Sequence, residues 1–187
     1  GLASRIYLGI YRNKKEQASR ILRFWKTELP LVIRKYHREM LYAFLVFMLF
    51  VILGAFSTAH DQGFVRGVLG DQYMDVTEDN IAKGDPFGIY KSESPLNMFL
   101  AIAKNNIEVS FMVFICGFIV SIGTVWQLFM NGIMLGVFQY YFFSKGLGWQ
   151  SVLVIWIHGT LEISSIIIAG AAGFVLGNSI LFPGTHR

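Results

Sequence analysis

The chain has 187 residues, of which 54% are hydrophobic and only 15% are charged. Soluble domains usually carry about 25% charged residues, so this composition argues against a soluble enzyme or binding module and indicates a helical membrane protein. The net charge of +4 does not point to nucleic acid, because ten of the 16 Lys and Arg residues lie within residues 1–39.

The distribution of charge predicts an orientation. Residues 1–39 carry ten basic and three acidic side chains, a balance of +7, whereas residues 60–95 carry three basic and seven acidic ones, a balance of −4. Loops rich in Lys and Arg stay on the cytoplasmic side of a membrane. We therefore expect the N-terminus in the cytoplasm and residues 60–95 outside.

Residues 1–39 are expected to form a basic amphipathic helix. Apolar side chains recur every three or four residues from Ile21 to Met40, with Arg and Lys between them. Pro30 should kink this helix, because proline lacks an N–H and clashes with the preceding turn. Such a helix could lie on an anionic lipid surface or pack on a neighbouring protein.

Residues 40–59 contain no charge and form the first predicted transmembrane helix. Residues 60–108 follow as an acidic extracytoplasmic segment, which several glycines should keep irregular apart from short helices. Four acidic residues there have near-helical spacing, namely Asp71, Asp75, Glu78 and Asp79. A solvated face is the favoured interpretation, with a cation site as the alternative. Ser94-Pro95 is typical of a helix start, so residues 95–107 are expected to form an interfacial helix.

Residues 109–144 are uncharged, and as one helix they would measure about 54 Å, against a hydrocarbon core of about 30 Å. The run should therefore break, and Asn131-Gly132 is the best place for a break. This predicts a transmembrane helix at 109–129 and a second helix at 130–149 that either spans the membrane or is re-entrant.

The last apolar run, residues 151–182, is also long, at about 48 Å if straight, so it should tilt or break near residue 159. It contains His158 and Glu162, which are four residues apart and can share one helix face. An ionisable pair inside a membrane segment suggests a functional site. It could be a buried polar lock, an ion or proton path, a partner-binding site or, last in rank, a metal or hydrolase site. The second His of the H-E-x-x-H zinc motif is missing.

Further polar and small residues punctuate the apolar runs. Five amides are candidates for lining a cavity or for bonding across helices: Asn105, Asn106, Gln127, Asn131 and Gln139. Five glycines are candidates for close helix packing, within one chain or between chains: Gly132, Gly136, Gly170, Gly173 and Gly177.

Several of these motifs together resemble the stage II sporulation protein M family over roughly residues 20–185. The motifs are Gly70-Asp71-Gln72-Tyr73, Asn80-Ile81, Gly84-Asp85-Pro86, Asn105-Asn106-Ile107 through Phe111, Gly123-Thr124, Asn131 to Gly136, His158 to Glu162 and Ala169 to Gly173. The resemblance implies a polytopic, all-α bundle in the bacterial or archaeal cytoplasmic membrane. Because relatives are usually longer, it also implies that this sequence is a fragment.

The family's namesake resembles a membrane platform that holds peptidoglycan-degrading enzymes. The resemblance therefore implies a non-enzymatic platform or assembly factor for a cell-envelope complex, with no catalytic residue and no cofactor. The expected partners are the lipid bilayer and other membrane or envelope proteins, with a homo-oligomer as an open alternative and no nucleic acid. The alternative function is an ion- or proton-coupled channel or transporter that uses His158 and Glu162.

Overall fold

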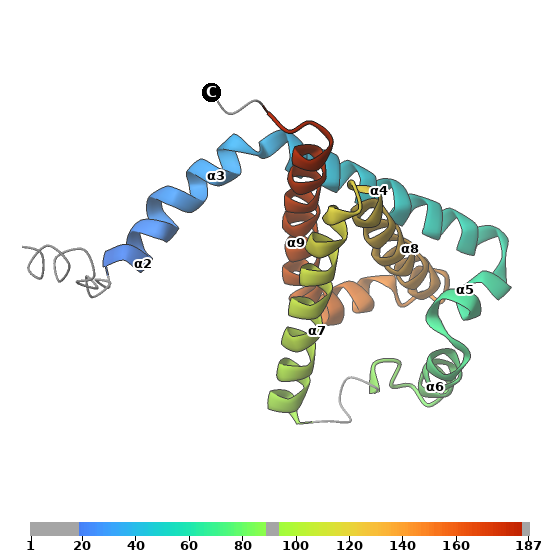
Figure 1. Cartoon of the computed structure of the whole chain (residues 1–187). Helices are drawn as coiled ribbons and strands as arrows, with labels where there is room; N and C mark the ends of the chain where they lie inside the picture. The colour runs from blue at the N-terminus through green and yellow to red at the C-terminus, as the bar shows by residue number, and fades with distance from the viewer. Residues whose placement is uncertain (1–18, 89–93, 185–187) are drawn as a thin grey trace, which may run out of the picture. The chain divides into compact units, whose positions relative to one another are not determined.

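The computed structural model describes residues 19–88 and 94–184, and these residues are α-helical without any strand (Figure 1). Within them, nothing is described of the side chains at positions 19, 62, 95, 155, 157 and 158. The chain divides into two compact units, residues 1–37 and residues 38–187. The all-α class predicted from the composition is confirmed.

The described part of the first unit is one helical stretch with a local change of winding. It consists of α2 (Ser19–Arg23), the π-helical turn η1 (Phe24–Glu28) and α3 (Leu29–Lys35). Pro30 lies in the first turn of α3, where the missing N–H is tolerated. The helix is not broken at the proline; instead it widens into the π turn just before it. Residues 1–18 of the predicted 1–39 helix lie outside the described residues.

The second unit contains the apolar helices. In chain order they are α4 (His37–His60), α5 (Gln62–Leu69), α6 (Asp71–Ala82), α7 (Pro95–Ile115), the 3-10 turn η3 (Cys116–Phe118), α8 (Ile122–Ser144) and α9 (Gly148–Leu181). By length and composition, three described stretches could cross a membrane: His37–His60, Leu96–Phe118 and Gly159–Leu181. These spans agree with the membrane class inferred from the composition.

The predicted break at Asn131-Gly132 is wrong, and so are the separate helices at 95–107 and 109–129. Residues 95–115 form one helix, α7, and the chain reverses at residues 116–121. Val120 and Ser121 make the reversal with positive φ angles of 50° and 65°. At Asn131 the side chain instead donates to the Gln127 carbonyl at 2.8 Å, so the polar residue is accommodated inside a continuous α8.

The polar segment after α4 forms two short helices that glycines terminate. Asp61 caps α5 by accepting a hydrogen bond from the Gly63 N–H at 2.8 Å. Gly70, with φ of 86°, separates α5 from α6, and Gly84, with φ of 79°, follows the end of α6. Such angles favour glycine, because it has no Cβ. The glycines therefore mark the ends of helices in this segment.

Helix α9 is assigned without interruption from Gly148 to Leu181, although its candidate span begins only at Gly159. Figure 1 shows its orange first part running in a different direction from its red remainder. Three hydroxyls near this change bond back to their own helix: Thr160 to the Trp156 carbonyl, Ser164 to Thr160 and Ser165 to Leu161. Such bonds often accompany helix bending, so the long run is accommodated by a bend rather than by an unwound break.

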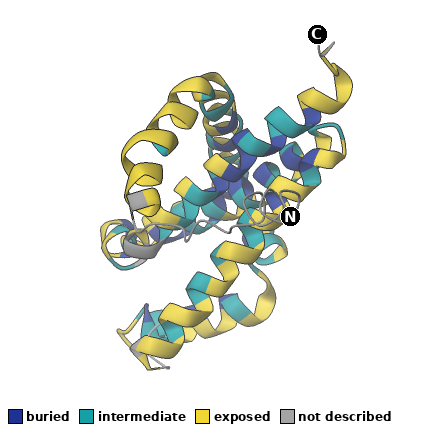
Figure 2. Cartoon of the chain, turned by 60° about the vertical axis from the view of Figure 1, so that its left-hand side comes forward, coloured by how far each residue is buried: buried dark blue, intermediate teal, exposed yellow. Residues whose placement is uncertain are grey.

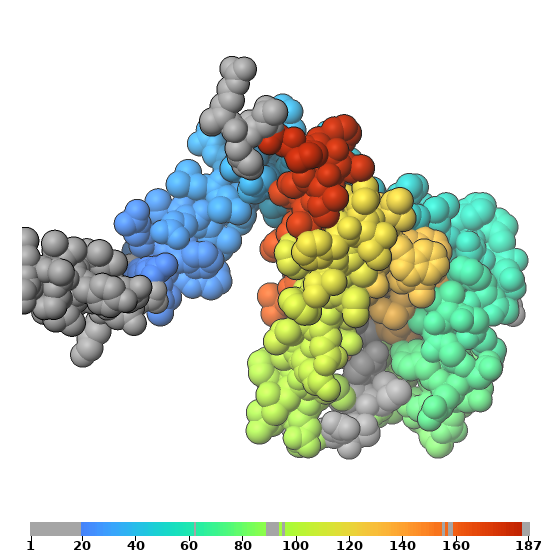
Figure 3. Space-filling view, in the orientation of Figure 1, coloured from blue at the N-terminus to red at the C-terminus, as the bar shows by residue number. Residues whose placement is uncertain are grey.

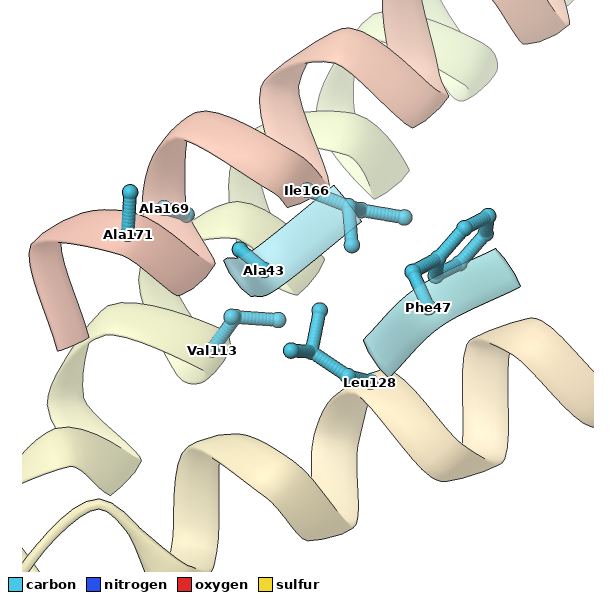
Figure 4. Packing of buried hydrophobic residues seen from close by; sticks show 7 residues of the cluster. All are labelled: Ala43, Phe47, Val113, Leu128, Ile166, Ala169 and Ala171. Carbon is cyan, nitrogen blue, oxygen red and sulfur yellow. The ribbon is translucent and has the colours of Figure 1, made fainter. Parts of the chain in front are cut away.

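Two hydrophobic clusters hold the second unit together. In the first, side chains from α4, α7, α8 and α9 converge (Figure 4): Ala43, Phe47, Val113, Leu128, Ile166, Ala169 and Ala171. The second joins α5, α6 and the segment after α6 to α8: Val65, Met74, Phe87, Ile133, Val137, Tyr141 and Phe142. Figure 2 shows the buried positions where helices meet and the exposed ones on their outer sides.

Candidate functional site

Glu162 lies half-buried in the candidate span of α9, and its contact with α7 is the centre of the candidate site. Asn105 Nδ2 donates to Glu162 Oε1 at 3.5 Å, across 57 residues of sequence. This distance is at the outer limit for a hydrogen bond, so the contact is weak. The structure therefore brings together two of the predicted polar residues. The side chain of His158 is not described, and the predicted His158–Glu162 pair stays a prediction.

Glu162 also lines a cavity of about 320 Å³. The wall is mostly apolar, and among the described lining residues the only other amide or carboxyl side chain is that of Asn131. The lining residues come from α4, α5, α6, α8 and α9: Phe47, Val68, Leu69, Tyr73, Asn131, Met134, Leu135, Phe138, Gly159, Glu162, Ile163 and Ile166. An apolar cavity with a few polar groups on its wall, here Tyr73, Asn131 and Glu162, is typical of a small-ligand site. Among the described residues, no group of three or more His, Cys, Asp or Glu could hold a metal ion.

The other predicted amides do not converge on this cavity. Gln127 Nε2 reaches the Cys116 sulfur at 3.8 Å, which ties the start of α8 to the turn η3. The side-chain amide oxygen of Asn106, Oδ1, is buried, and no hydrogen bond to it is found in the described part of the chain. The predicted amides therefore make different contacts and do not line one common cavity.

Gly132 and Gly136 bring α8 directly against α4. A Cβ on Gly132 would lie 2.9 Å from the Phe47 carbonyl oxygen, and a Cβ on Gly136 would overlap the Val51 carbonyl oxygen. On the opposite helix, a Cβ on Gly54 would lie 2.6 Å from the Ile133 carbonyl oxygen. We call these three residues the α4–α8 glycine contact, since there the two backbones touch without intervening side chains.

The glycines of α9 pack closely on the turn before α8 and on the first part of α8. A Cβ on Gly173 would overlap the Thr124 hydroxyl, and a Cβ on Gly177 would overlap the Ser121 side chain. Gly170 is less tight, since a Cβ there would lie 3.2 Å from the Leu128 side chain. All five predicted packing glycines thus lie against other helices or turns of the same chain.

A polar tie between α8 and α9 centres on Gln139, one of the amides expected to bond across helices or to line a cavity. Gln139 Nε2 donates to the Ser151 hydroxyl at 2.9 Å, and Gln139 Oε1 accepts from the Trp156 indole at 3.0 Å. Ser151 is fully buried and also donates to the Gly148 carbonyl at 2.7 Å. Gln139 is an amide within an otherwise apolar run, and it bonds across helices rather than lining the cavity beside Glu162.

The acidic face of α6 surrounds Arg66 of α5. The guanidinium lies 2.7 Å from Asp75, 2.9 Å from Glu78 and 3.5 Å from Asp71. The hydrogen bond to Asp75 is the main cause that raises the pKa of Arg66 above its usual value. We call these four residues the Arg66 cluster. Three of the four carboxylates that the sequence left open as a cation site thus gather around a cation from their own chain.

Comparison with known proteins agrees with this architecture. The stage II sporulation protein M family model matches residues 43–187, which is most of the chain and includes α5 to α9. No curated protein and no solved structure gives a significant match. With three helices able to cross a membrane and this match, the chain belongs to the stage II sporulation protein M family of membrane proteins.

Proposed function

We propose that this protein is a non-enzymatic platform for other proteins of the cell envelope. The observation that supports it best is the attachment of α5 and α6 to the apolar helices. Val65, Met74 and Phe87 are buried with Tyr141 and Phe142 of α8, so a polar helical pair is fixed to the membrane part. A rigid polar element on a membrane bundle can present a surface to a partner without ordering a flexible segment on binding.

The surface of this element is acidic. Asp71, Asp75, Glu78 and Asp79 are all exposed on α6, where Val76 adds an apolar side chain that is 40% exposed. Figure 3 shows α5 and α6 at the side of the unit, with α7 forming the face toward the viewer. The partner of this surface is proposed to be an envelope protein with a basic docking face.

The proposed topology follows from the charge balance. The basic residues 1–39 would lie in the cytoplasm, the acidic residues 60–95 outside, and the chain would cross a bacterial or archaeal cytoplasmic membrane several times. The absence of enzymatic activity is part of the proposal.

Site-specific photo-crosslinking in native membranes tests the platform. A photoreactive residue at Gln72 or Val76, four apart on the exposed face of α6, should give the same discrete protein adduct. Phe99 is the matched control, since this exposed side chain of α7 should react with lipid. Lipid adducts alone at Gln72 and Val76 would contradict the proposal.

One observation favours the second candidate, an ion- or proton-coupled channel or transporter. Glu162 lines a cavity within a candidate span, where ionisable residues commonly mark ion paths. In proteoliposomes, this function requires a flux that Glu162→Gln abolishes and that Glu108→Gln, on the exposed face of α7, leaves intact. Wild-type protein that carries no flux would favour the platform.

A further inference from the structure

A second cavity, of about 300 Å³, lies where α4 and α8 end and where α5 and α6 pack on them. Its lining residues are Thr58, Ala59, Val65, Arg66, Met74, Glu78, Tyr140, Tyr141, Ser144 and Lys145. Three of these side chains are charged, whereas Glu162 is the only charged side chain among the described residues that line the first cavity. The proposed platform does not use this cavity as a binding site, although Val65, Met74 and Tyr141 of its lining also hold α5 and α6 against α8.

Tyr141 supplies the first indication that this cavity is a ligand-binding site. Its side chain lines the cavity and is only 6% exposed, and its hydroxyl is buried without a hydrogen-bond partner among the described residues. Buried hydroxyls in folded proteins are almost always hydrogen-bonded. The Tyr141 hydroxyl is therefore available to a bound group.

Lys145 supplies the second sign. Its ammonium lies 5.5 Å from the centre of the Tyr141 ring, which attracts it through the ring's negative face. Within the described part of the chain, Lys145 forms no ion pair. One wall of the cavity thus offers a cation and a hydroxyl donor, which together suit an anionic oxygen.

Glu78, in contrast, suits a positively charged group of the ligand. Arg66 Nη2 donates to one of its carboxylate oxygens, which leaves the second oxygen for another donor. The carbonyl ends of α4 and α8 also lie at this cavity, and helix C-termini favour positive charge. A purely anionic ligand would be repelled here, whereas a ligand that carries both charges matches the cavity.

The position of the cavity indicates that such a ligand comes from the membrane. Thr58 and Ala59 lie in the last turn of the candidate span His37–His60, which places them at the level of lipid headgroups. Tyr140, Tyr141 and Lys145 are residue types that gather at that level. We propose that this cavity binds the headgroup of a membrane lipid that carries a phosphate and a primary ammonium, with phosphate at Lys145 and Tyr141 and ammonium at Glu78.

The test is native mass spectrometry of the full chain, delipidated in detergent, with short-chain phospholipids that bear ethanolamine, choline or glycerol headgroups. The ethanolamine lipid should bind about tenfold or more tightly than either other lipid, since choline cannot donate to Glu78 and glycerol carries no cation. Tyr141→Phe and Lys145→Gln should each weaken this binding by about tenfold. Lys83→Gln, an exposed control outside the cavity, should leave it unchanged.

Thermal unfolding separates loss of the site from loss of the fold. Because the Tyr141 hydroxyl has no hydrogen-bond partner among the described residues, Tyr141→Phe should not lower the Tm of the delipidated chain. It should instead reduce the Tm increase that the ethanolamine lipid causes. Equal binding of all three lipids, unaffected by Tyr141→Phe and Lys145→Gln, would overturn the proposal, and so would tighter binding of the glycerol lipid.

Discussion

The α4–α8 glycine contact and the Arg66 cluster hold neighbouring helices by opposite means. Between α4 and α8 the backbones touch at Gly54, Gly132 and Gly136, and each contact depends on the absence of a side chain. Between α5 and α6, the long side chain of Arg66 contacts three exposed carboxylates. The first contact depends on shape, the second on charge.

This difference fits the surroundings of each contact. Apolar helices gain little hydrophobic stabilisation from one another in lipid, so close packing and dispersion must hold them together. The Arg66 cluster is exposed, where water and salt weaken ion pairs, so the buried Val65, Met74 and Phe87 must provide most of the attachment of α5 and α6. The glycine contact should therefore tolerate substitution far less than the ion cluster.

The largest expected effect is that of Gly136→Ala. Alanine normally stabilises a helix relative to glycine by about 0.5–1 kcal/mol, but here the added Cβ would overlap the Val51 carbonyl oxygen. We expect overpacking to lower the free energy of unfolding by about 1–3 kcal/mol. Gly67→Ala in α5 is the control, because nothing lies within 4 Å of a Cβ there. Thermal unfolding in detergent should show opposite shifts; an increased Tm for both variants would refute the close contact.

An intermediate effect is expected for Gln139→Leu. The substitution removes the hydrogen bonds to Ser151 and Trp156, of which Ser151 is fully buried. We expect a loss of about 1–2 kcal/mol in the free energy of unfolding, together with a change in tryptophan fluorescence. Gln150→Leu, an exposed position on the same helix, serves as the control. Equal stability of the two variants would show that the tie contributes nothing.

The smallest effect is expected for Arg66→Gln. The Tm should fall slightly at low salt and hardly at all at high salt, because the cluster is exposed. Since bonding to Asp75 raises the pKa of Arg66, its contribution persists at ordinary pH and is lost only when the pH rises through that raised pKa. Lys83→Gln, which breaks one exposed pair with Asp79, should change the Tm even less. A decrease in Tm for Arg66→Gln that does not depend on salt would mean that the packing of this side chain, and not only its charge, stabilises the contact.

The sequence was informative where a signal was local. The charge-free residues 40–59 lie within α4, and the apolar C-terminal run 151–182 lies within α9 except for Phe182. The position of the reversal before α8 was not predictable in the same way. Asn131-Gly132 is a typical turn dipeptide, but inside α8 Gly132 packs on Phe47 and the Asn131 side chain bonds back to Gln127. Tertiary packing thus overrides the turn signal.

The candidate site was predictable only in part. Glu162 was singled out because a carboxylate in an apolar run needs partners, but sequence cannot show that Asn105, 57 residues earlier, lies beside it. The Arg66 cluster shows the same limit. The helical spacing of the acidic residues was visible, whereas the cation among them depends on how α5 folds back on α6.

The reversal between α7 and α8 has a consequence for the order of assembly. Val120 is β-branched and has a positive φ, a conformation that costs about 1–3 kcal/mol unless its surroundings enforce it. The neighbouring Ser121 is in contact with Gly177, near the end of α9. During synthesis this part of α9 emerges more than 50 residues later, so the reversal should become fixed only when α9 arrives. The last helix would then complete the hairpin formed before it.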